Sequence, residues 1–172
     1  MGWLSKLLKR KAVENSIKGC GKQLNEIWSI EDTSSFVAAL SMYIAEKCQF
    51  GDNMQVLSVP ERFFYITQSL EMEVNNGGFA QFFQNSSGDF SNELVNAFLE
   101  IGAVKTAKIC KKAVSIFAGK VPGDRDDRDE IISNNEEFEA ILAECDKAFF
   151  EYEEDLNALN YAYVMKNREA FT

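Results

Sequence analysis

Histidine is absent from the 172 residues, and the four cysteines, Cys20, Cys48, Cys110 and Cys145, form no Cys-x-x-Cys pair. Zinc fingers, Ser-His-Asp triads, Cys-His dyads and histidine-ligated haem are therefore excluded within one chain. Cys110 and Cys145 fall on apolar helical stripes, where a buried thiol behaves as a small hydrophobic side chain. Four scattered cysteines in a chain expected in the cytoplasm do not argue for disulfides.

Proline and glycine are also scarce, with two and ten residues, which is few for an all-β chain of this length. The plentiful Ala, Leu, Glu and Lys favour helix instead. No apolar run reaches the ~18 residues that a membrane-spanning helix needs. Lys6 interrupts the apolar residues near the start, so a signal peptide is not expected and a cytoplasmic location is the default. Gly77-Gly78 is a lone pair without the spacing of a phosphate-binding loop.

Negative charge is abundant but unevenly placed. The net charge of −9 is divided into +5 over residues 1–25, −4 over residues 26–123 and −10 over residues 124–172. A basic head and an acidic last third make direct nucleic-acid binding by the whole surface unfavourable. We therefore expect a basic N-terminal segment, residues 1–25, followed by a single helical domain, residues 26–172.

The basic head has amphipathic spacing and predicts a short helix over about residues 3–11. Its apolar and its basic residues face mostly opposite ways: Trp3, Leu4, Leu7 and Leu8 against Lys6, Lys9, Arg10 and Lys11. Such a helix could pack on its own domain or on a second subunit. Membrane contact through residues 1–11, on an anionic surface, and disorder are the alternatives.

Apolar residues at helical spacing, with capping residues and glycines between them, predict a series of helices. They run from Asp32–Ser34 to before Gly51, then over about 60–75, 79–85, 91–101, 104–118 and 135–160, with a break at 119–123. The charged run 123–130 lacks the spacing of an EF-hand loop, so we expect a solvated loop leading into a helix. The fold prediction is all-α: one compact multi-helix domain of six to eight helices with no significant sheet.

The most specific stretch is residues 73–85, Glu-Val-Asn-Asn-Gly-Gly-Phe-Ala-Gln-Phe-Phe-Gln-Asn. Glycine, and less readily asparagine, accepts the left-handed conformation that ends a helix. The stretch therefore predicts a helix–turn–helix corner rather than a ligand site. Its residues divide into helix stops (Asn75, Asn76, Gly77, Gly78), buried rings (Phe79, Phe82, Phe83) and amides expected to bond exposed backbone (Gln81, Gln84, Asn85).

The motif Asn-Asn-Gly-Gly-Phe-x-Gln-Phe-Phe-x-Asn, followed by Ile101-Gly-Ala103, resembles the bacterial family typified by DNA mimic protein nineteen. The resemblance covers roughly residues 35–155 and is sharpest over 71–104. It implies a small, acidic, all-helical protein. The named member is a dimer that displays carboxylates like DNA phosphates, so the resemblance implies a homodimer and a basic DNA-binding protein as partner. The motif itself does not contain the mimicking charges.

Two acidic rows accompany the apolar stripe of the helix predicted over 135–160. Their members recur every seven residues, ~10 Å apart on a helix: Glu137, Glu144 and Glu151 in one row, Glu139, Asp146 and Glu153 in the other. With Asp155, these residues are the predicted partner-binding set. The alternative is an ordinary solvated face. A positive face of four lysines could interrupt this surface or pair with it across a dimer: Lys105, Lys108, Lys111 and Lys112.

Two carboxylates, Glu71 and Glu73, lie close in sequence to Asn75 and Asn76 and suggest acid–base chemistry as a less favoured alternative. A ferritin-like metal site needs Glu-x-x-His motifs, which a chain without histidine cannot supply. The preferred reading is a non-catalytic, acidic interaction protein without cofactor or metal, acting as a DNA mimic. A helical interaction module without mimicry is the other alternative.

Overall fold

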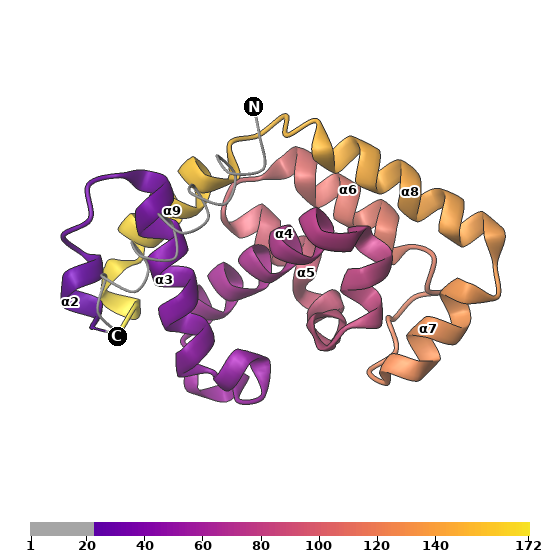
Figure 1. The fold of residues 1–172 in the computed structure, drawn as a ribbon, viewed down its shortest axis with the longest axis horizontal. Helices are drawn as coiled ribbons and strands as arrows, with labels where there is room; N and C mark the ends of the chain where they lie inside the picture. The colour runs from indigo at the N-terminus through magenta and orange to yellow at the C-terminus, as the bar shows by residue number, and fades with distance from the viewer. Residues whose placement is uncertain (1–22) are drawn as a thin grey trace, which may run out of the picture.

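The computed structural model describes residues 23–172, and within them there are eight α-helices, short 3-10 turns and no strand (Figure 1). The helices are α2 (Leu24–Ile27), α3 (Thr33–Lys47), α4 (Val59–Gln84), α5 (Ser91–Glu100), α6 (Val104–Val114), α7 (Arg125–Ser133), α8 (Glu136–Phe150) and α9 (Leu156–Lys166). The 3-10 turns are Gln49–Gly51, Met54–Val56, Ser86–Phe90 and Arg168–Ala170. The predicted all-α fold is confirmed for these residues. The helix predicted over 3–11 and Cys20 lie outside them.

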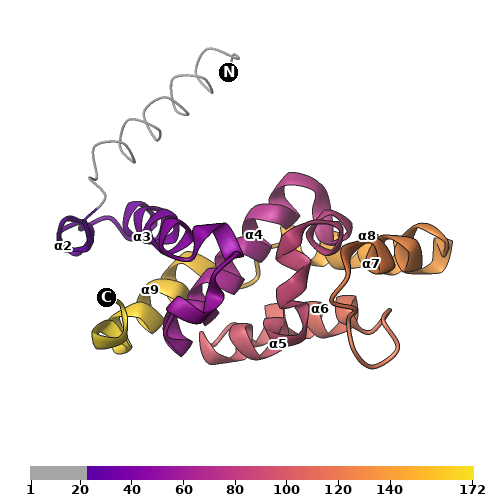
Figure 2. The same ribbon diagram turned by 90° about the horizontal axis from the view of Figure 1, so that it is seen from below.

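Helix α4 runs through the middle of the molecule, with other helices on both sides (Figures 1 and 2). Toward one end, α2 packs on α3, and α3 packs on α9 and on α4. Toward the other end, α5, α7 and α8 pack on α4, and α6 packs on α5 and α8. Both groups of helices are therefore joined through α4.

A single hydrophobic cluster fills the space around α4. Its fully buried members come from several helices and include Leu40 and Ile44 from α3, Phe64, Ile66, Leu70 and Val74 from α4, Leu94 and Phe98 from α5, Ala113 from α6 and Val164 from α9. Cys110 and Cys145 are buried in it, which confirms their predicted place on apolar stripes. Cys48 is buried as well.

The starts of α3 and α4 carry side-chain caps. Asp32 accepts a hydrogen bond from the Ser35 amide at 2.8 Å, which confirms the predicted start of α3. Glu61, fully buried, closes a capping box with Ser58 and also accepts bonds from Lys47 Nζ (2.7 Å) and the Thr172 amide (3.1 Å). This carboxylate therefore joins α3, α4 and the segment that follows α9.

Helix α4 is bent at the two glycines. The backbone is non-helical only at Gly77 (φ −159°, ψ 19°) and Gly78 (φ 80°, ψ −179°). The conformation of Gly78 lies in a region that is essentially restricted to glycine. The predicted glycine corner is confirmed, although Asn75 and Asn76 lie inside the first helical segment rather than ending it.

The corner is held by a contact from α8. The Phe79 amide, freed by the bend, donates to Asp146 Oδ1 at 2.7 Å. A β-carbon on Gly78 would lie 2.5 Å from Asp146 Oδ2, so glycine is needed for this approach as well as for the backbone. Phe79, Phe82 and Phe83 are fully buried, as predicted. Their rings make edge contacts, including Phe79 with Phe149 and Phe83 with Phe117.

The amides after the corner do not bond exposed backbone, so that prediction was wrong. Gln81 Nε2 and Asn85 Nδ2 donate to Glu73 at 2.6 and 2.9 Å, and Gln84 Nε2 donates to Asp129 at 2.5 Å. The bend turns the second segment back toward the first, which brings Glu73 within reach of both amides. A carboxylate is the stronger acceptor.

The single helix predicted over 135–160 was also wrong. Helix α8 ends at Phe150, Tyr152 adopts a left-handed φ of 44°, and α9 begins only at Leu156. Asp155 caps α9 by accepting from the Ala158 amide at 2.9 Å. The apolar spacing continues across the break, because both helices pack on the same core, and this hid the break from a periodicity argument.

The corner gives a stability prediction. Gly78→Ala should lower the free energy of unfolding by about 1–3 kcal/mol, because it combines a positive φ with a clash against Asp146. Gly77→Ala should cost less, since the φ of Gly77 is negative and its new β-carbon would meet the flexible Gln81 side chain. Urea unfolding of both variants measures the difference. Equal losses would contradict the assignment of the strain to Gly78.

Candidate partner-binding surface

The densest acidic stretch of the chain, residues 124–139, forms the cap and body of α7 and the first turn of α8. It contains eight carboxylates and two arginines. Asp124 caps α7 by accepting from the Asp126 amide at 2.8 Å, and Asn135 caps α8 by accepting from the Glu137 amide at 3.0 Å. The prediction of a solvated loop over 123–130 was wrong, because Asp124 starts a helix directly and acidic residues suit its positive end.

We call the carboxylates of this stretch the acidic end. All are exposed: Asp124, Asp126, Asp127, Asp129, Glu130, Glu136, Glu137 and Glu139. Helices α7 and α8 contact each other at one extremity of the molecule, seen at the right of Figures 1 and 2. Arg125 is the one exposed cation within residues 124–139, with Nε 3.9 Å from Asp126 Oδ1. The acidic end is therefore a surface of nearly uniform sign.

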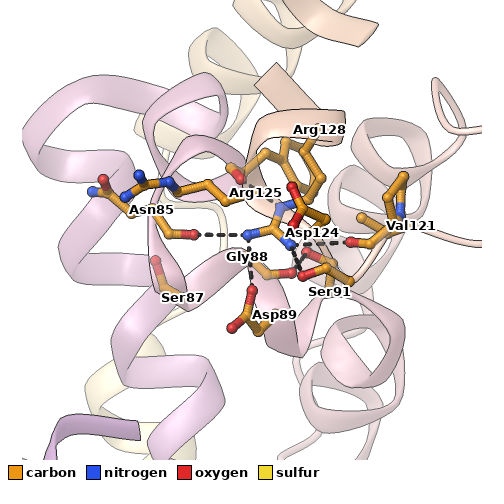
Figure 3. A network of polar contacts seen from close by, with 12 residues as sticks. Asn85, Ser87, Gly88, Asp89, Ser91, Val121, Asp124, Arg125 and Arg128 are labelled. Atoms are coloured by element: carbon orange, nitrogen blue, oxygen red, sulfur yellow. Dashed lines mark hydrogen bonds and ion pairs between the residues drawn. The ribbon is translucent and has the colours of Figure 1, made fainter. Parts of the chain in front are cut away.

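Arg128, the second arginine of the stretch, is fully buried beneath it. Figure 3 shows its guanidinium at the centre of a polar network. Its donors reach five oxygens: Nε to Phe83 O (2.7 Å), Nη1 to Pro122 O and Gly123 O (3.0 Å each), and Nη2 to Asn85 O (3.0 Å) and Asp89 Oδ1 (2.9 Å). A guanidinium has five N–H donors, so the buried charge is completely hydrogen-bonded.

This network fixes α7 against the end of α4. Phe83 and Asn85 supply carbonyls at the C-terminus of α4, where helix carbonyls lack partners and a cation is favoured. Gly88 makes room, because a β-carbon there would lie 2.7 Å from Phe83 O and 2.9 Å from Arg128 Nε. Sequence reasoning missed Arg128, although its position four residues before the buried Ile132 places both on one helix face.

The seven predicted partner-binding residues are not brought together as two rows. Asp146 is half-buried. The other six are exposed: Glu137, Glu139, Glu144, Glu151, Glu153 and Asp155. Burial raises the pKa of Asp146, although its bond from the Phe79 amide opposes that rise. Asp146 thus holds the corner, and Asp155 caps α9. Neither residue is free for a partner.

Two more of the predicted residues form ion pairs with lysines of α6. Lys112 Nζ lies 2.5 Å from Glu144 Oε2, and Lys105 Nζ lies 2.7 Å from Glu153 Oε2. The predicted positive face therefore pairs, at these two lysines, with carboxylates of its own chain. Glu154 accepts from the amides of Lys105 (2.9 Å) and Thr106 (2.8 Å) and so caps α6 from outside that helix.

The two carboxylates of the less favoured catalytic hypothesis line different hollows. Tyr152 Oη donates to Glu71 Oε1 at 3.1 Å and accepts from Asn75 Nδ2 at 2.5 Å. Burial raises the pKa of Glu71. Glu71 lines a groove of about 470 Å³ beside α3, whereas Glu73 and Asn76 line another hollow, and Glu73 is bonded to the amides described above. The two carboxylates do not converge on one point.

Two further observations concern the part of the chain that the structure describes. Residues 23–172 contain no cluster of three or more His, Cys, Asp or Glu side chains placed to hold a metal ion. None of the helices described there is both long enough and apolar enough to cross a membrane.

Comparison with known proteins identifies the family. A family model described as DMP19-like protein matches residues 55–167, so the protein belongs to the DMP19-like protein family. The match runs from the start of α4 to the end of α9 and includes the glycine corner, Arg128 and the acidic end. The predicted resemblance is confirmed. No curated protein and no solved structure matches the chain.

The buried guanidinium gives a second stability prediction. Arg128→Met should cost about 3–5 kcal/mol, because it leaves buried carbonyl oxygens without donors. Arg128→Lys should recover little, since an ammonium cannot reproduce the planar fork. The exposed Arg125→Met is the matched control and should change stability by no more than about 0.5 kcal/mol. If Arg128→Met and Arg125→Met unfolded at the same urea concentration, the network would not be the anchor of α7.

The raised pKa of Glu71 gives a pH prediction. A buried carboxylate destabilises the folded state when ionised, and protonation relieves this as the pH falls. Glu71→Gln removes the charge, keeps an acceptor for Tyr152 and should be at least as stable as the parent at neutral pH. The free energy of unfolding of the parent should rise relative to that of this variant as the pH falls from 7 toward 4.5, the ordinary pKa of a Glu side chain. Urea unfolding of both proteins across that pH range measures this difference. A parent that became less stable than the variant on acidification would contradict the prediction.

Proposed function

We propose that this protein is a non-catalytic interaction protein and a DNA mimic. In this proposal the acidic end occupies the DNA-binding surface of a basic protein, in the place that DNA would take. The observation that carries the proposal is the group of eight exposed carboxylates on α7 and the start of α8, with one exposed cation among them. Membership of the DMP19-like protein family supports it.

The spacing of the charges on α7 favours binding by a polycation. Residues three or four apart on a helix have β-carbons ~5–6 Å apart. Asp126 therefore neighbours both Asp129 and Glu130, and Asp127 neighbours Glu130. Each like-charged pair costs about 0.2–0.5 kcal/mol in an isolated helix. Lys and Arg side chains of a partner would relieve that repulsion, as they do for the dense phosphates of DNA.

The proposed surface differs from the two rows expected from the sequence. It keeps Glu137 and Glu139, which lie in the first turn of α8, and adds the carboxylates of α7. Exposed Glu151 caps the far end of α8, and Glu144 and Glu153 are partly neutralised by lysines. A homodimer, which the family resemblance implied, remains a prediction that the mass in solution would test.

The proposal is tested by removing four charges from the acidic end. The variant Asp126→Asn, Asp127→Asn, Glu137→Gln, Glu139→Gln keeps side-chain size and should keep the fold. A basic DNA-binding partner, isolated from a native lysate and then purified, should bind it roughly tenfold more weakly or worse, since exposed charge pairs contribute about 0.2–1 kcal/mol each. The matched control removes four exposed carboxylates elsewhere, Glu26, Glu31, Glu46 and Glu169, and should bind like the parent.

Competition with duplex DNA separates mimicry from ordinary association. A mimic and DNA cannot occupy one basic surface together, so duplex DNA should displace the protein, and added salt should weaken the complex. A stable ternary complex of partner, DNA and this protein would refute mimicry. It would leave a plain helical interaction module whose acidic surface serves solubility.

A further inference from the structure

A groove of about 470 Å³ lies between α3 and α4, away from the acidic end. Its mouth carries large apolar side chains that are unusually open to solvent: Met42 is 42% exposed, Phe50 65% and Met72 67%. Val37, Ala38 and Ala45 contribute further apolar surface from α3. Exposed apolar side chains that gather at one place on a protein surface commonly mark an interaction site.

The backbone that presents Phe50 is strained. Gln49 and Phe50 have φ values of 53° and 57°, a left-handed conformation that residues other than glycine rarely adopt, here twice in succession. Backbone strain of this kind is concentrated at binding sites. The strained turn therefore holds a phenyl ring that is 65% exposed beside the groove.

The groove is also negative. Glu71 lies in its lining, and no Lys or Arg does. One further carboxylate, Asp52, lies near Tyr65 of the lining. Burial raises the pKa of Tyr65 to about 12, and the charge of Asp52 adds to that rise. A ligand for this groove should therefore be apolar on one side and cationic on the other.

We propose that the groove binds the basic amphipathic segment of its own chain, residues 3–11. The apolar side chains of that segment meet the mouth of the groove, and its cations meet the surrounding carboxylates. The contributing residues are Trp3, Leu4, Leu7 and Leu8 on the apolar side and Lys6, Lys9, Arg10 and Lys11 on the cationic side.

Length and reach fit this occupant. The lining positions on α3 run from Ser34 to Ala45, about 16 Å at 1.5 Å per residue, and nine residues of helix would measure about 14 Å. The connecting residues 12–22 can span up to about 36 Å. Helix α2 follows them directly and packs on α3. Tethering at this range gives an effective concentration of order millimolar, so a weak site is enough.

Trp3 reports the docking directly. The chain has two tryptophans, so Trp28→Phe in the full-length protein leaves Trp3 as the only one. Its emission should be blue-shifted and shielded from acrylamide. Adding Met42→Lys and Met72→Lys, both at exposed positions, removes apolar contacts and repels the cationic segment, so the emission and the quenching should shift to those of free tryptophan while circular dichroism stays unchanged. The matched control, Leu99→Lys with Val104→Lys, changes exposed apolar residues outside the groove and should leave Trp3 shielded.

Other outcomes would overturn the proposal. If Trp3 is exposed in the parent, or becomes shielded only on anionic vesicles, the segment does not occupy the groove. If the groove variant leaves Trp3 shielded, the segment docks elsewhere. If shielding follows protein concentration together with a doubling of mass by light scattering, the occupant is the segment of a second copy rather than that of the same chain.

Discussion

The buried guanidinium of Arg128 is the interaction on which the acidic end depends. It satisfies the last carbonyls of α4, the carbonyls of the loop before α7 and the carboxylate of Asp89 with its five donors. A charge removed from water is tolerated only when it is fully paired, and this one is. Because α4 also carries the glycine corner, the position of α7 is linked through Arg128 to the fully buried phenylalanines that follow this corner. Carboxylates held close together repel one another. A helix that carries them therefore needs an anchor such as Arg128 to keep its position.

Carboxylates in this chain have two separable uses. One group is consumed by the fold: Asp146 holds the corner, Glu154 and Asp155 cap helices, and Glu61 joins α3 to α4. The other group, on α7 and the first turn of α8, is exposed and bears a net negative charge that the described residues around it do not balance. Within the second group Asp124 also caps α7 and Asp129 accepts from Gln84, which leaves six carboxylates that can meet a partner without loss of a contact from the fold.

The sequence predicted well what local chemistry decides. The glycine corner and its buried phenylalanines follow from the conformational freedom of glycine and from apolar spacing, and both were predicted correctly. The break between α8 and α9 was missed because periodicity continued across it. The burial of Arg128 was missed because a run of charged residues is expected to be exposed to solvent. Its burial depends on carbonyls more than forty residues away in sequence, at Phe83 and Asn85, which no local pattern reveals.

The proposed function requires a basic partner to bind α7 and the start of α8. Hydrogen exchange of the purified complex, compared with the free protein, tests it most directly because it locates the contact without any substitution. We expect added amide protection within residues 124–139 and none at the exposed face of α5. Protection confined to α3 and α9, with residues 124–139 exchanging as in the free protein, would contradict it.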